Sequence, residues 1–546
     1  MKLHQIGAIL FLLVRTTGFG QVDENVIFNS SNLPIVIINT NGLTIVDDPK
    51  ITADMGIIDN GTARNNVTDP YNAFSGKIGI EIRGSSSQMF PKKQWGIELR
   101  DDAGESKEAS LLGMPAEEDW VLFAPYNDKT LMRDALAYAL GREMGGVYAP
   151  RTRYCEVVLN NVYQGVYVLI EKIKRDKNRV DINKLDPDEV SGNNLTGGYI
   201  FKIDKSTGGD GEGWASNYPP SHASNQTIYF QYDYPKAENI VDVQKTYIQT
   251  QVKAFEDALH GDQFADPALG YAKYIDVNSF IDYFIMQELT KNVDGFRLST
   301  FLYKQRDSDG GKIVLGPIWD FNLGFGNADY CTKGEPKGWA NNFNMICPDD
   351  YWLIPFWWDR LFTDPAFGTK VASRWATLRA GAFQESAIQN RIDSLTNLLN
   401  AESQQRNFKA WKVLGQYVWP NYYVGPTFQD EVTHLKKWVS ERLIWMDQNM
   451  PLLITAVESE KAKSTVSASP NPFSSDVTID YELTRPGDVT IRILDALGRT
   501  VNHTDIPHSG PGHFAYTWTG SGAQGIYFFN VRQGPKVLGS GKLSRK

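Results

Sequence analysis

Two neighbouring stretches decide the interpretation of this chain: KNVDGFRLSTFLYK (291–304) and GKIVLGPIWDFNLGFGN (311–327). Asp294 lies in a turn between a helix and a strand, and Asp320 follows an apolar strand and enters a glycine-rich turn. Two loop carboxylates of this kind suit a base and a divalent cation, because Mg²⁺ prefers one or two carboxylates together with substrate phosphates. Each aspartate taken singly is also explained as a turn residue or a strand-end residue.

Outward from these stretches, the pattern predicts a β-rich lobe followed by a helical lobe. The hydrophobic periodicity and the turn residues define the elements. The expected strands are 33–42, 77–84, 92–101, 120–126 and 197–205, with a hairpin over 153–173. The expected helices are 129–146, 241–259 and 277–291, followed by a helical tail from 352 to about 450.

Length and composition restrict the class of protein. The 546 residues exceed one ordinary domain, and 42% hydrophobic with 22% charged residues is typical of globular proteins. A net charge of −9 argues against a nucleic-acid partner, which requires a basic face. Seven His and three Cys make a zinc site or a disulfide scaffold improbable.

The N-terminus resembles an export signal. Lys2 precedes the apolar run IGAILFLLV (6–14), and the small residues Gly18 and Gly20 follow it. This order predicts a signal peptide over residues 1–20. The alternative is a short membrane anchor, but nine apolar residues are too few to cross a bilayer. Since no later stretch reaches 18 uninterrupted apolar residues, we expect no transmembrane span in the mature chain.

The C-terminus forms a separate unit. The charged stretch ESEKAKST (458–465) lies in a linker over 455–468, and four short alternating strands follow at 477–483, 489–501, 514–520 and 525–534. Glycine- and proline-rich turns separate these strands. This spacing predicts a small all-β sandwich over 469–546.

This unit resembles the type A C-terminal sorting domain of the type IX secretion system. The resemblance rests on SPNPF (469–473), ILDALGR (493–499), GIYFFNV (525–531) and GKLSRK (541–546). It implies that the signal peptide carries the chain across the inner membrane and that the sorting domain carries it across the outer one. The type IX secretion machinery is then a partner, and the protein is secreted or held on the outer cell surface.

The central region resembles the CotH family of atypical protein kinases. The matching stretches, in order, are RGSSSQMFPKKQWGIEL (83–99), DWVLFAPYNDKTLMRDALAYALGREMG (119–145), YCEVVLNNVYQGVYVLIEKIKRDKNRVDI (154–182), GGYIFKIDK (197–205) and the two stretches quoted first. An N-terminal β-rich segment (21–76) precedes the CotH-like domain with its helical tail (77–454). The resemblance implies a divergent bilobal protein-kinase-like α+β fold with a helical C-terminal extension. It also implies ATP as donor and Ser or other hydroxyl groups of proteins as acceptors.

The resemblance also assigns roles to residues. Asp294 matches the catalytic-loop aspartate that accepts a proton, and Asp320 matches the aspartate that binds Mg²⁺ or Mn²⁺ in a DFG-like turn. Ser299 occupies the position where the kinase pattern has Asn, and a hydroxyl is a weaker metal ligand than an amide carbonyl. Asn322, two residues beyond Asp320, is a compensating ligand.

Several residues are candidates for the nucleotide. Arg83, Ser85, Ser86 and Ser87 form a small-residue turn whose backbone N–H groups suit a phosphate. Lys92 and Lys93 supply point charges for phosphate, or are simply solvated at a strand start. Glu171 and Lys172 end one apolar strand and Lys202 ends another, and both strand ends can face the nucleotide. Arg297 and Lys304 meet a phosphate or form surface salt bridges.

Aromatic residues make up 12% of the chain, and one dense group of them lies between Trp339 and Trp358. Aromatic side chains dominate buried area, so most of this group is expected in the core, with a stacking platform for sugar or peptide as the alternative. In an oxidising compartment we expect a disulfide between Cys331 and Cys347. Cys155 lies in a strand and is expected as a buried free thiol.

Three functions remain open at this point. The first is an exported, metal-dependent phosphotransferase, and the second is a non-catalytic surface scaffold with a kinase-like fold. Ser299, the lack of a G-x-G-x-x-G motif and the scarcity of ATP outside the cell favour the scaffold. A carboxylate-based hydrolase is third, because no partner carboxylate for general-acid work is evident.

Overall fold

The computed structural model describes residues 22–205, 211–223, 225–400, 402–450, 466–483, 486–495, 499–508, 510–520, 523–534 and 536–546. The predicted signal peptide and most of the predicted linker therefore lie outside the described residues. The chain divides into two compact units. The first comprises residues 1–356 and 378–443, and the second comprises 357–377 and 444–546.

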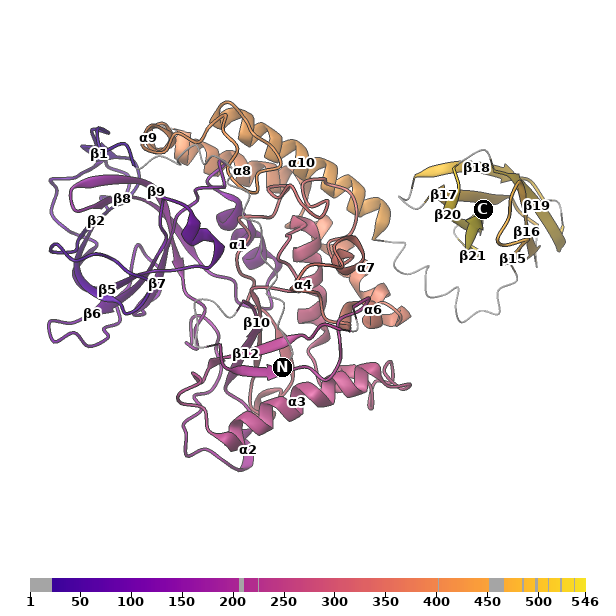
Figure 1. The fold of residues 1–546 in the computed structure, drawn as a ribbon, viewed down its shortest axis with the longest axis horizontal. Coiled ribbons are helices and arrows are strands. Elements are labelled where there is room, and N and C mark those ends of the chain that lie inside the picture. Colours follow the sequence, from indigo (N-terminus) through magenta and orange to yellow (C-terminus); the bar gives the residue numbers. More distant parts are fainter. Residues whose placement is uncertain are drawn as a thin grey trace, which may run out of the picture. The chain divides into compact units, whose positions relative to one another are not determined.

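The first unit begins with a closed barrel of seven strands in the order β2-β3-β5-β6-β7-β9-β8 (Figure 1). The strands are β2 (Ile35–Asn39), β3 (Ile51–Ile58), β5 (Phe74–Ile82), β6 (Trp95–Arg100), β7 (Asp119–Phe123), β8 (Thr152–Leu159) and β9 (Val162–Glu171). A small pair, β1 (Ser30–Ser31) with β4 (Asn65–Asn66), lies outside the barrel sheet. β8 and β9 form the predicted hairpin, and Asn160 and Asn161 take the positive φ values that its tight turn requires.

Closure depends on one long-range pairing. β2 runs parallel to β8, with Ile35 opposite Glu156, whereas the other neighbours in the barrel are antiparallel. Alternate side chains point inward and fill the barrel, so that residues such as Trp120, Ile97 and Val157 are buried. The mixed α+β class is confirmed. The expectation of a kinase-like sheet lobe is corrected to a closed barrel, and β5 crosses the boundary predicted between residues 76 and 77.

A second, five-stranded sheet follows in the first unit, in the order β11-β12-β10-β13-β14. Its strands are β10 (Tyr199–Ile203), β11 (Gly213–Ala215), β12 (Tyr229–Tyr234), β13 (Thr300–Lys304) and β14 (Ile313–Leu315). The stretch that contains Asp294 therefore leads into an inner strand, β13, which pairs with both β10 and β14.

Helices surround these sheets. They are α1 (Arg133–Met144), α2 (Gly192–Leu195), α3 (Asp242–His260), α4 (Val277–Thr290), α5 (Phe343–Ile346), α8 (Glu385–Asn400), α9 (Ser403–Ala410) and α10 (Phe428–Asn449). The short 3₁₀ turns are Ser86–Met89, Tyr271–Lys273 and Asp307–Asp309. α9 packs on barrel strand β9, and α1 packs against α4 and α8 (Figure 1). The predicted helices 241–259 and 277–291 match α3 and α4 within one residue at each end.

The second unit contains α6 (Trp357–Leu361), most of α7 (Pro365–Arg379) and a β-sandwich. The sandwich has one sheet β15-β16-β19 and a second sheet β18-β17-β20-β21. The strands are β15 (Val466–Ser469), β16 (Asp476–Leu483), β17 (Val489–Asp495), β18 (Thr500–Ile506), β19 (Gly512–Thr519), β20 (Gly525–Gln533) and β21 (Lys536–Arg545). The small all-β sandwich is confirmed, and the predicted strand 489–501 is divided between β17 and β18.

The SPNPF stretch has a structural explanation within the sandwich. The Phe473 ring is almost fully buried and packs against Trp518 at 5.7 Å. The Asn471 side chain donates to the Lys542 carbonyl at 2.6 Å and accepts from the Ser544 N–H at 2.8 Å. The stretch therefore fastens the last strand to the rest of the sandwich.

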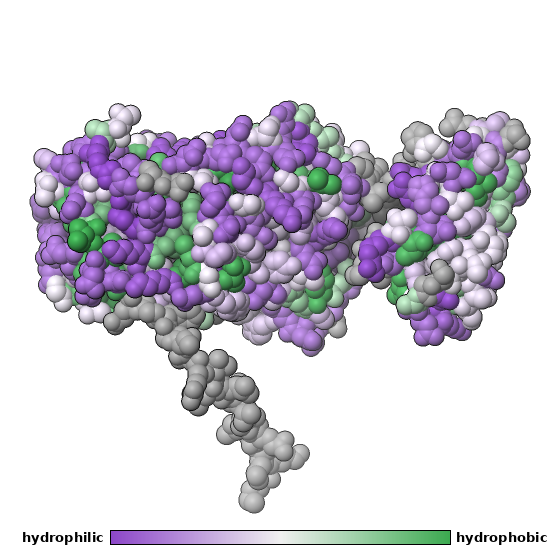
Figure 2. All heavy atoms as spheres, turned by 90° about the horizontal axis from the view of Figure 1, so that it is seen from above, coloured by the Kyte–Doolittle hydropathy of each residue, from purple (hydrophilic) through white to green (hydrophobic). Residues whose placement is uncertain are grey.

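The face seen in Figure 2 is mostly hydrophilic, with small, separated apolar patches. Over the described residues, none of the helices combines the length and the apolar character needed to cross a bilayer.

Candidate active site

A cleft of about 720 Å³ lies in the first unit. It is lined by side chains from the barrel rim, from the end of β10 and from the stretches 291–304 and 311–327. It contains most of the residues that the sequence singled out. These are Arg83, Ser85, Ser86, Ser87, Lys202, Asp294, Ser299, Asp320 and Asn322. The sequence therefore predicted most of one continuous site, although its members are up to 239 residues apart in the chain.

Asp294 is positioned by the end of α4. The helix stops at Lys291, whose left-handed backbone (φ 46°) turns the chain, with the Lys291 N–H still donating to the Gln287 and Glu288 carbonyls. The Leu298 N–H then donates to the Asp294 carbonyl at 2.9 Å, which closes a tight turn around the aspartate. The Asn292 side chain donates to the Asp320 carbonyl at 2.9 Å. One amide therefore ties the two aspartate loops together.

Asp320 is held in an unusual backbone conformation. Its φ of 62° lies in the left-handed region, which costs a non-glycine residue about 1–2 kcal/mol. Its N–H donates to the Tyr138 hydroxyl at 3.1 Å, and the next N–H, that of Phe321, donates to the Asp134 carboxylate at 2.8 Å. Because Tyr138 and Asp134 belong to α1, this helix fixes the turn. Strain that is maintained in this way is typical of functional sites.

The charge environment of Asp320 is also unusual. Burial raises the pKa of its carboxyl to about 7, and the negative charges of Asp294 and Asp204 add to this shift. Lys205 and Arg83 lower the pKa in the opposite direction but do not cancel the shift. Ionising this buried carboxyl group is costly when the group stands alone, and a cation bound beside it would offset that cost. The site therefore fits a divalent metal.

Asp204 is a cleft residue that the sequence reasoning missed. It directly follows β10. Burial is the main cause that raises the pKa of its carboxyl group, while Lys202 and the backbone N–H groups of Lys205 and Ser299 lower that pKa. A signal was present, because Asp204 is a third carboxylate at the end of an apolar strand, in the same stretch as Lys202. The backbone N–H of Ser299 thus donates to the Asp204 carboxyl group. Ser299 is the residue that stands where the kinase pattern has Asn.

The carboxylate oxygens of Asp204, Asp294 and Asp320 do not all lie within 4.8 Å of one another. Among the described residues, the one group of three carboxylates with oxygens within 4.8 Å of one another is Glu117, Glu118 and Asp119, and all three pair with the Lys174 ammonium. The cleft therefore suits a cation that is completed by substrate oxygens, as Mg²⁺ sites with nucleotides are. Asn322, whose side-chain N–H donates to the Asn127 Oδ1 at 3.3 Å, stands two residues beyond Asp320.

Basic residues also line the cleft. The Arg83 guanidinium lies 5.6 Å from the centroid of the Trp319 ring, and burial lowers its pKa against the opposing effect of Asp320. The turn after Arg83 is rigid, because Gln94 donates to the Ser87 hydroxyl at 2.6 Å and Gln88 donates to the Gly84 carbonyl at 2.8 Å. The remaining cations that line the cleft are Lys50, Lys172, Lys202, Lys205 and Lys236.

Three predicted nucleotide contacts do not line the cleft. Lys92 is 2% exposed and donates to the Val166 carbonyl at 2.6 Å and to Asn407 at 2.9 Å, and burial lowers its pKa to about 7. Lys93 donates to the Gln88 carbonyl at 2.5 Å. Glu171 is buried and accepts from Arg151 at 2.7 Å and from Tyr148 at 2.9 Å. These side chains are structural, and the interpretation of Lys92 and Lys93 as exposed is corrected for Lys92.

Strand alternation explains the error at Glu171. Successive side chains along a strand point to opposite faces, and the next residue, Lys172, is the one that lines the cleft. Arg297 and Lys304 are likewise buried rather than at the surface. Arg297 pairs with Asp294 and Asp350, and Lys304 pairs with Asp307.

Two further expectations concern the segment beyond Asp320. The Cys331–Cys347 disulfide is present, with Cα atoms 5.9 Å apart, and Cys155 is a buried free thiol. Trp357 and Trp358 are fully buried, whereas Tyr351 is 80% exposed. Trp419, which stacks on Tyr330 at 6.1 Å, and Trp319 line the cleft itself.

Comparisons with known proteins agree with this division of the chain. A family model described as CotH kinase protein matches residues 80–446, which is more than half of the chain. A second, described as secretion system C-terminal sorting domain, matches residues 467–542 and indicates export to the cell surface or the medium. No curated protein matches the chain.

One similar solved structure is that of the alkylpurine DNA glycosylase AlkC from Pseudomonas fluorescens, bound to DNA that contains an abasic site analog. It shares 11% sequence identity, with 36% of this chain and 56% of that chain covered, and the TM-score is 0.11. The chain thus spans little more than half the length of that protein, and a likeness at this level carries no argument about fold or function.

Proposed function

The chain belongs to the CotH kinase protein family, and from that premise we propose that it is an exported phosphotransferase. In this proposal the ATP γ-phosphoryl group passes, with Mg²⁺ or Mn²⁺, to Ser or other hydroxyl side chains of proteins. On this proposal the barrel would take the role of the N-terminal lobe of a kinase, and the five-stranded sheet with its helices would take the role of the C-terminal lobe. The observation that carries the proposal is the pair Asp294 and Asp320, joined through Asn292 in one cleft.

The proposed roles follow from position and charge. Asp294, on a tight turn at the cleft, accepts the proton of the acceptor hydroxyl and orients that hydroxyl for attack. Asp320 would hold the cation, with Asn322 or the Ser299 hydroxyl as a second ligand, and the cation supplies charge neutralisation for the phosphates when bound. Arg83, the Ser85–Ser87 turn and Lys202 would contact the phosphates. Lys172, Lys205 and Asp204, which also line the cleft, join this set in the proposal.

This function is tested by incubating the full-length protein with labelled ATP, Mn²⁺ or Mg²⁺ and candidate acceptor proteins. Wild-type transfer that is lost in both Asp294→Asn and Asp320→Ala is the expected result. Asp262→Asn, which changes an exposed carboxylate outside the cleft, is the matched control and should keep full transfer. Equal transfer by wild type and Asp320→Ala would exclude the assigned metal role.

A second function, a non-catalytic binding scaffold, is favoured by one specific observation. Trp319 and Trp419 line the cleft, and Trp419 is 38% exposed, which suits stacking on a sugar or a peptide side chain. Thermal-shift titration separates the two functions, since a ligand at 100 times its dissociation constant stabilises the folded state by about 2.7 kcal/mol. A shift with glycans and none with ATP and Mn²⁺ would favour the scaffold.

A further inference from the structure

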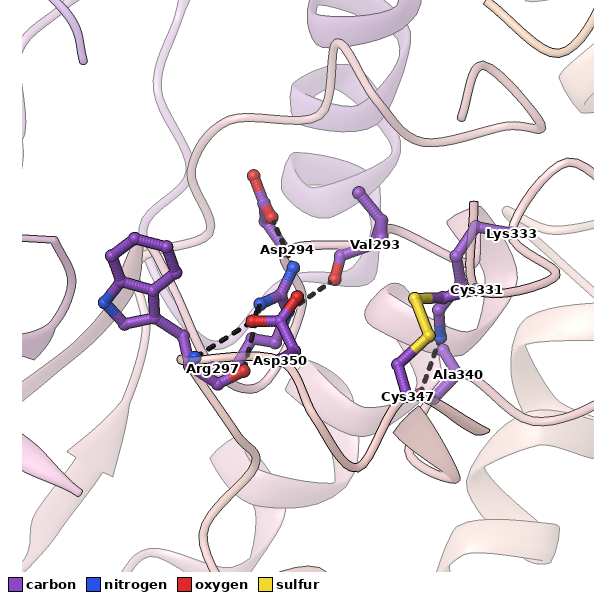
Figure 3. The surroundings of a disulfide bond; sticks show 9 residues. Val293, Asp294, Arg297, Cys331, Lys333, Ala340, Cys347 and Asp350 are labelled. Atoms are coloured by element: carbon purple, nitrogen blue, oxygen red, sulfur yellow. Dashed lines mark hydrogen bonds and ion pairs between the residues drawn. A yellow bond between two sulfur atoms is a disulfide. The ribbon is translucent and has the colours of Figure 1, made fainter. Parts of the chain in front are cut away.

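Arg297 lies between the proposed catalytic aspartate and the disulfide-closed segment (residues 331–347). Its guanidinium is 3% exposed and donates to the Asp294 carboxylate at 3.1 Å, to the Asp350 carboxylate at 3.0 Å and to the Trp352 carbonyl at 3.0 Å. Its Nε donates to the Val293 carbonyl at 2.8 Å (Figure 3). Arg297 therefore holds both the backbone before Asp294 and the carboxylate itself.

The other side of Arg297 depends on the disulfide-closed segment. The Phe343 ring, which is buried, lies with its centroid 4.0 Å from the guanidinium carbon. Asp350 stands three residues after Cys347, and its N–H donates to the Cys347 carbonyl at 3.2 Å. Both contacts that complete the Arg297 environment are thus made by residues inside, or just after, the segment that the disulfide closes, and Figure 3 shows the contact with Asp350.

Buried charges fix the first half of this segment directly. Lys291 donates to the Thr332 and Glu335 carbonyls, and Lys333 donates to the Ala340 carbonyl. Glu288 accepts from the Ala340 and Asn341 N–H groups. These anchors cover residues 332–341, whereas Phe343 lies in the second half of the segment and Asp350 just beyond it. The Cys331–Cys347 bond joins the end of the second half to the start of the anchored half.

We propose that the Cys331–Cys347 disulfide and Arg297 form a brace that fixes the Asp294 carboxylate, so that the oxidised protein is the competent form. This inference rests on the proposed function. Bond formation removes two electrons and two protons from the two thiols. A thiol–disulfide oxidoreductase of the oxidising compartment accepts them as its own disulfide becomes a dithiol. Export then supplies both the compartment and the active geometry.

Arg297 is a positioning residue in this account, and the disulfide acts through it. The test compares full-length wild type, the double variant Cys331→Ser/Cys347→Ser, Arg297→Lys and the triple variant that combines them. A lysine keeps the charge but cannot bridge Asp294, Asp350 and two carbonyls with one planar fork. The controls are Cys155→Ser, which removes the free thiol of the barrel, and Arg306→Lys, whose guanidinium pairs with Glu189 outside the cleft.

Two readouts are measured on each protein: kcat with the KM for ATP, and hydrogen exchange of peptides that cover residues 291–299. We expect kcat to fall about tenfold in the double variant and in Arg297→Lys, with the KM for ATP changed less than twofold. The Arg297 and Leu298 amides, which donate to the Asp294 carbonyl, exchange about tenfold faster. The triple variant loses little more than either parent, because both changes act through one element.

The outcomes separate the brace from a disulfide that merely stabilises the fold. A lower melting temperature with unchanged kcat and unchanged exchange at 291–299 overturns the brace. If the double variant does not fold, Arg297→Lys decides by the same two readouts. If wild type transfers no phosphoryl group, the proposed function fails and exchange alone decides the brace: faster exchange at 291–299 supports it, and unchanged exchange overturns it.

Discussion

The cleft and the C-terminal sandwich use burial in opposite ways. In the sandwich, the buried side chains are largely apolar, with Val477, Ile491 and Val531 fully buried. In the cleft, burial falls on ionisable groups and raises the pKa values of Asp320 and Asp204 while lowering that of Arg83. The sandwich is therefore organised for stability, and the cleft keeps costly charges where a ligand can neutralise them. Perturbed groups of this kind in one cleft are typical of functional sites.

The largest expected effect separates chemistry from stability in the cleft. Asp294→Asn should lower kcat by about 10²–10⁴-fold, since that is the contribution of a positioned proton acceptor. The amide keeps the shape of the carboxylate, and Asp350 still pairs with Arg297 when the charge of Asp294 is removed, so the melting temperature should change little. Steady-state kinetics with calorimetry on the same preparation measure both quantities. A loss of activity that matches a loss of folded protein would contradict the assigned role.

The next effect belongs to the sandwich. Phe473→Ala should lower its free energy of unfolding by about 3–5 kcal/mol, because the buried ring would leave a cavity beside Trp518. Hydrogen exchange resolved by peptide should show lost protection over 477–531 and unchanged protection over 291–327. Phe528→Ala, which truncates a 45% exposed ring, is the matched control and should have a small effect. Lost protection in both regions would contradict the expectation that the sandwich is destabilised without effect on the cleft.

Asp320→Asn should remove metal-dependent transfer and yet stabilise the metal-free protein. Because the folded-state pKa of Asp320 is raised to about 7 from 3.8, ionisation favours the unfolded chain. The gain is fully present above pH 7, shrinks as the pH falls below 7 and disappears below pH 4. We expect at least about 1 kcal/mol at pH 8 in chelator. Denaturant unfolding at pH 4 and pH 8 measures it, and an equal gain at both pH values would contradict the cause.

The smallest effect tests the correction at Lys92. Lys92→Met should leave the KM for ATP within about twofold, because the ammonium contacts Val166 and Asn407 rather than the cleft. Lys93→Met should behave in the same way, since Lys93 donates to the Gln88 carbonyl. Lys202→Met, by contrast, changes a cation that lines the cleft and should raise the KM. A raised KM in Lys92→Met would restore the first interpretation.

The sequence pattern predicted those parts of the site that depend on residues close together in the chain. Asp294 and Asp320 follow from turn and strand signals close to them in the chain, and α3 and α4 follow from helical periodicity. Barrel closure depends on the pairing of Ile35 with Glu156, which lie far apart in sequence and carry no local signal. Which of two neighbours faces the cleft, as with Glu171 and Lys172, depends on strand register. Register is set by the assembled sheet.

The proposed function depends most on Asp320 holding a divalent cation together with a nucleotide. Calorimetric titration of full-length wild type and Asp320→Asn with Mn²⁺ and a non-hydrolysable ATP analogue measures this. We expect tight binding of the analogue to wild type that depends on Mn²⁺, and at least about tenfold weaker binding to Asp320→Asn. Equal binding to the two proteins, or no Mn²⁺-dependent binding to wild type, would contradict it.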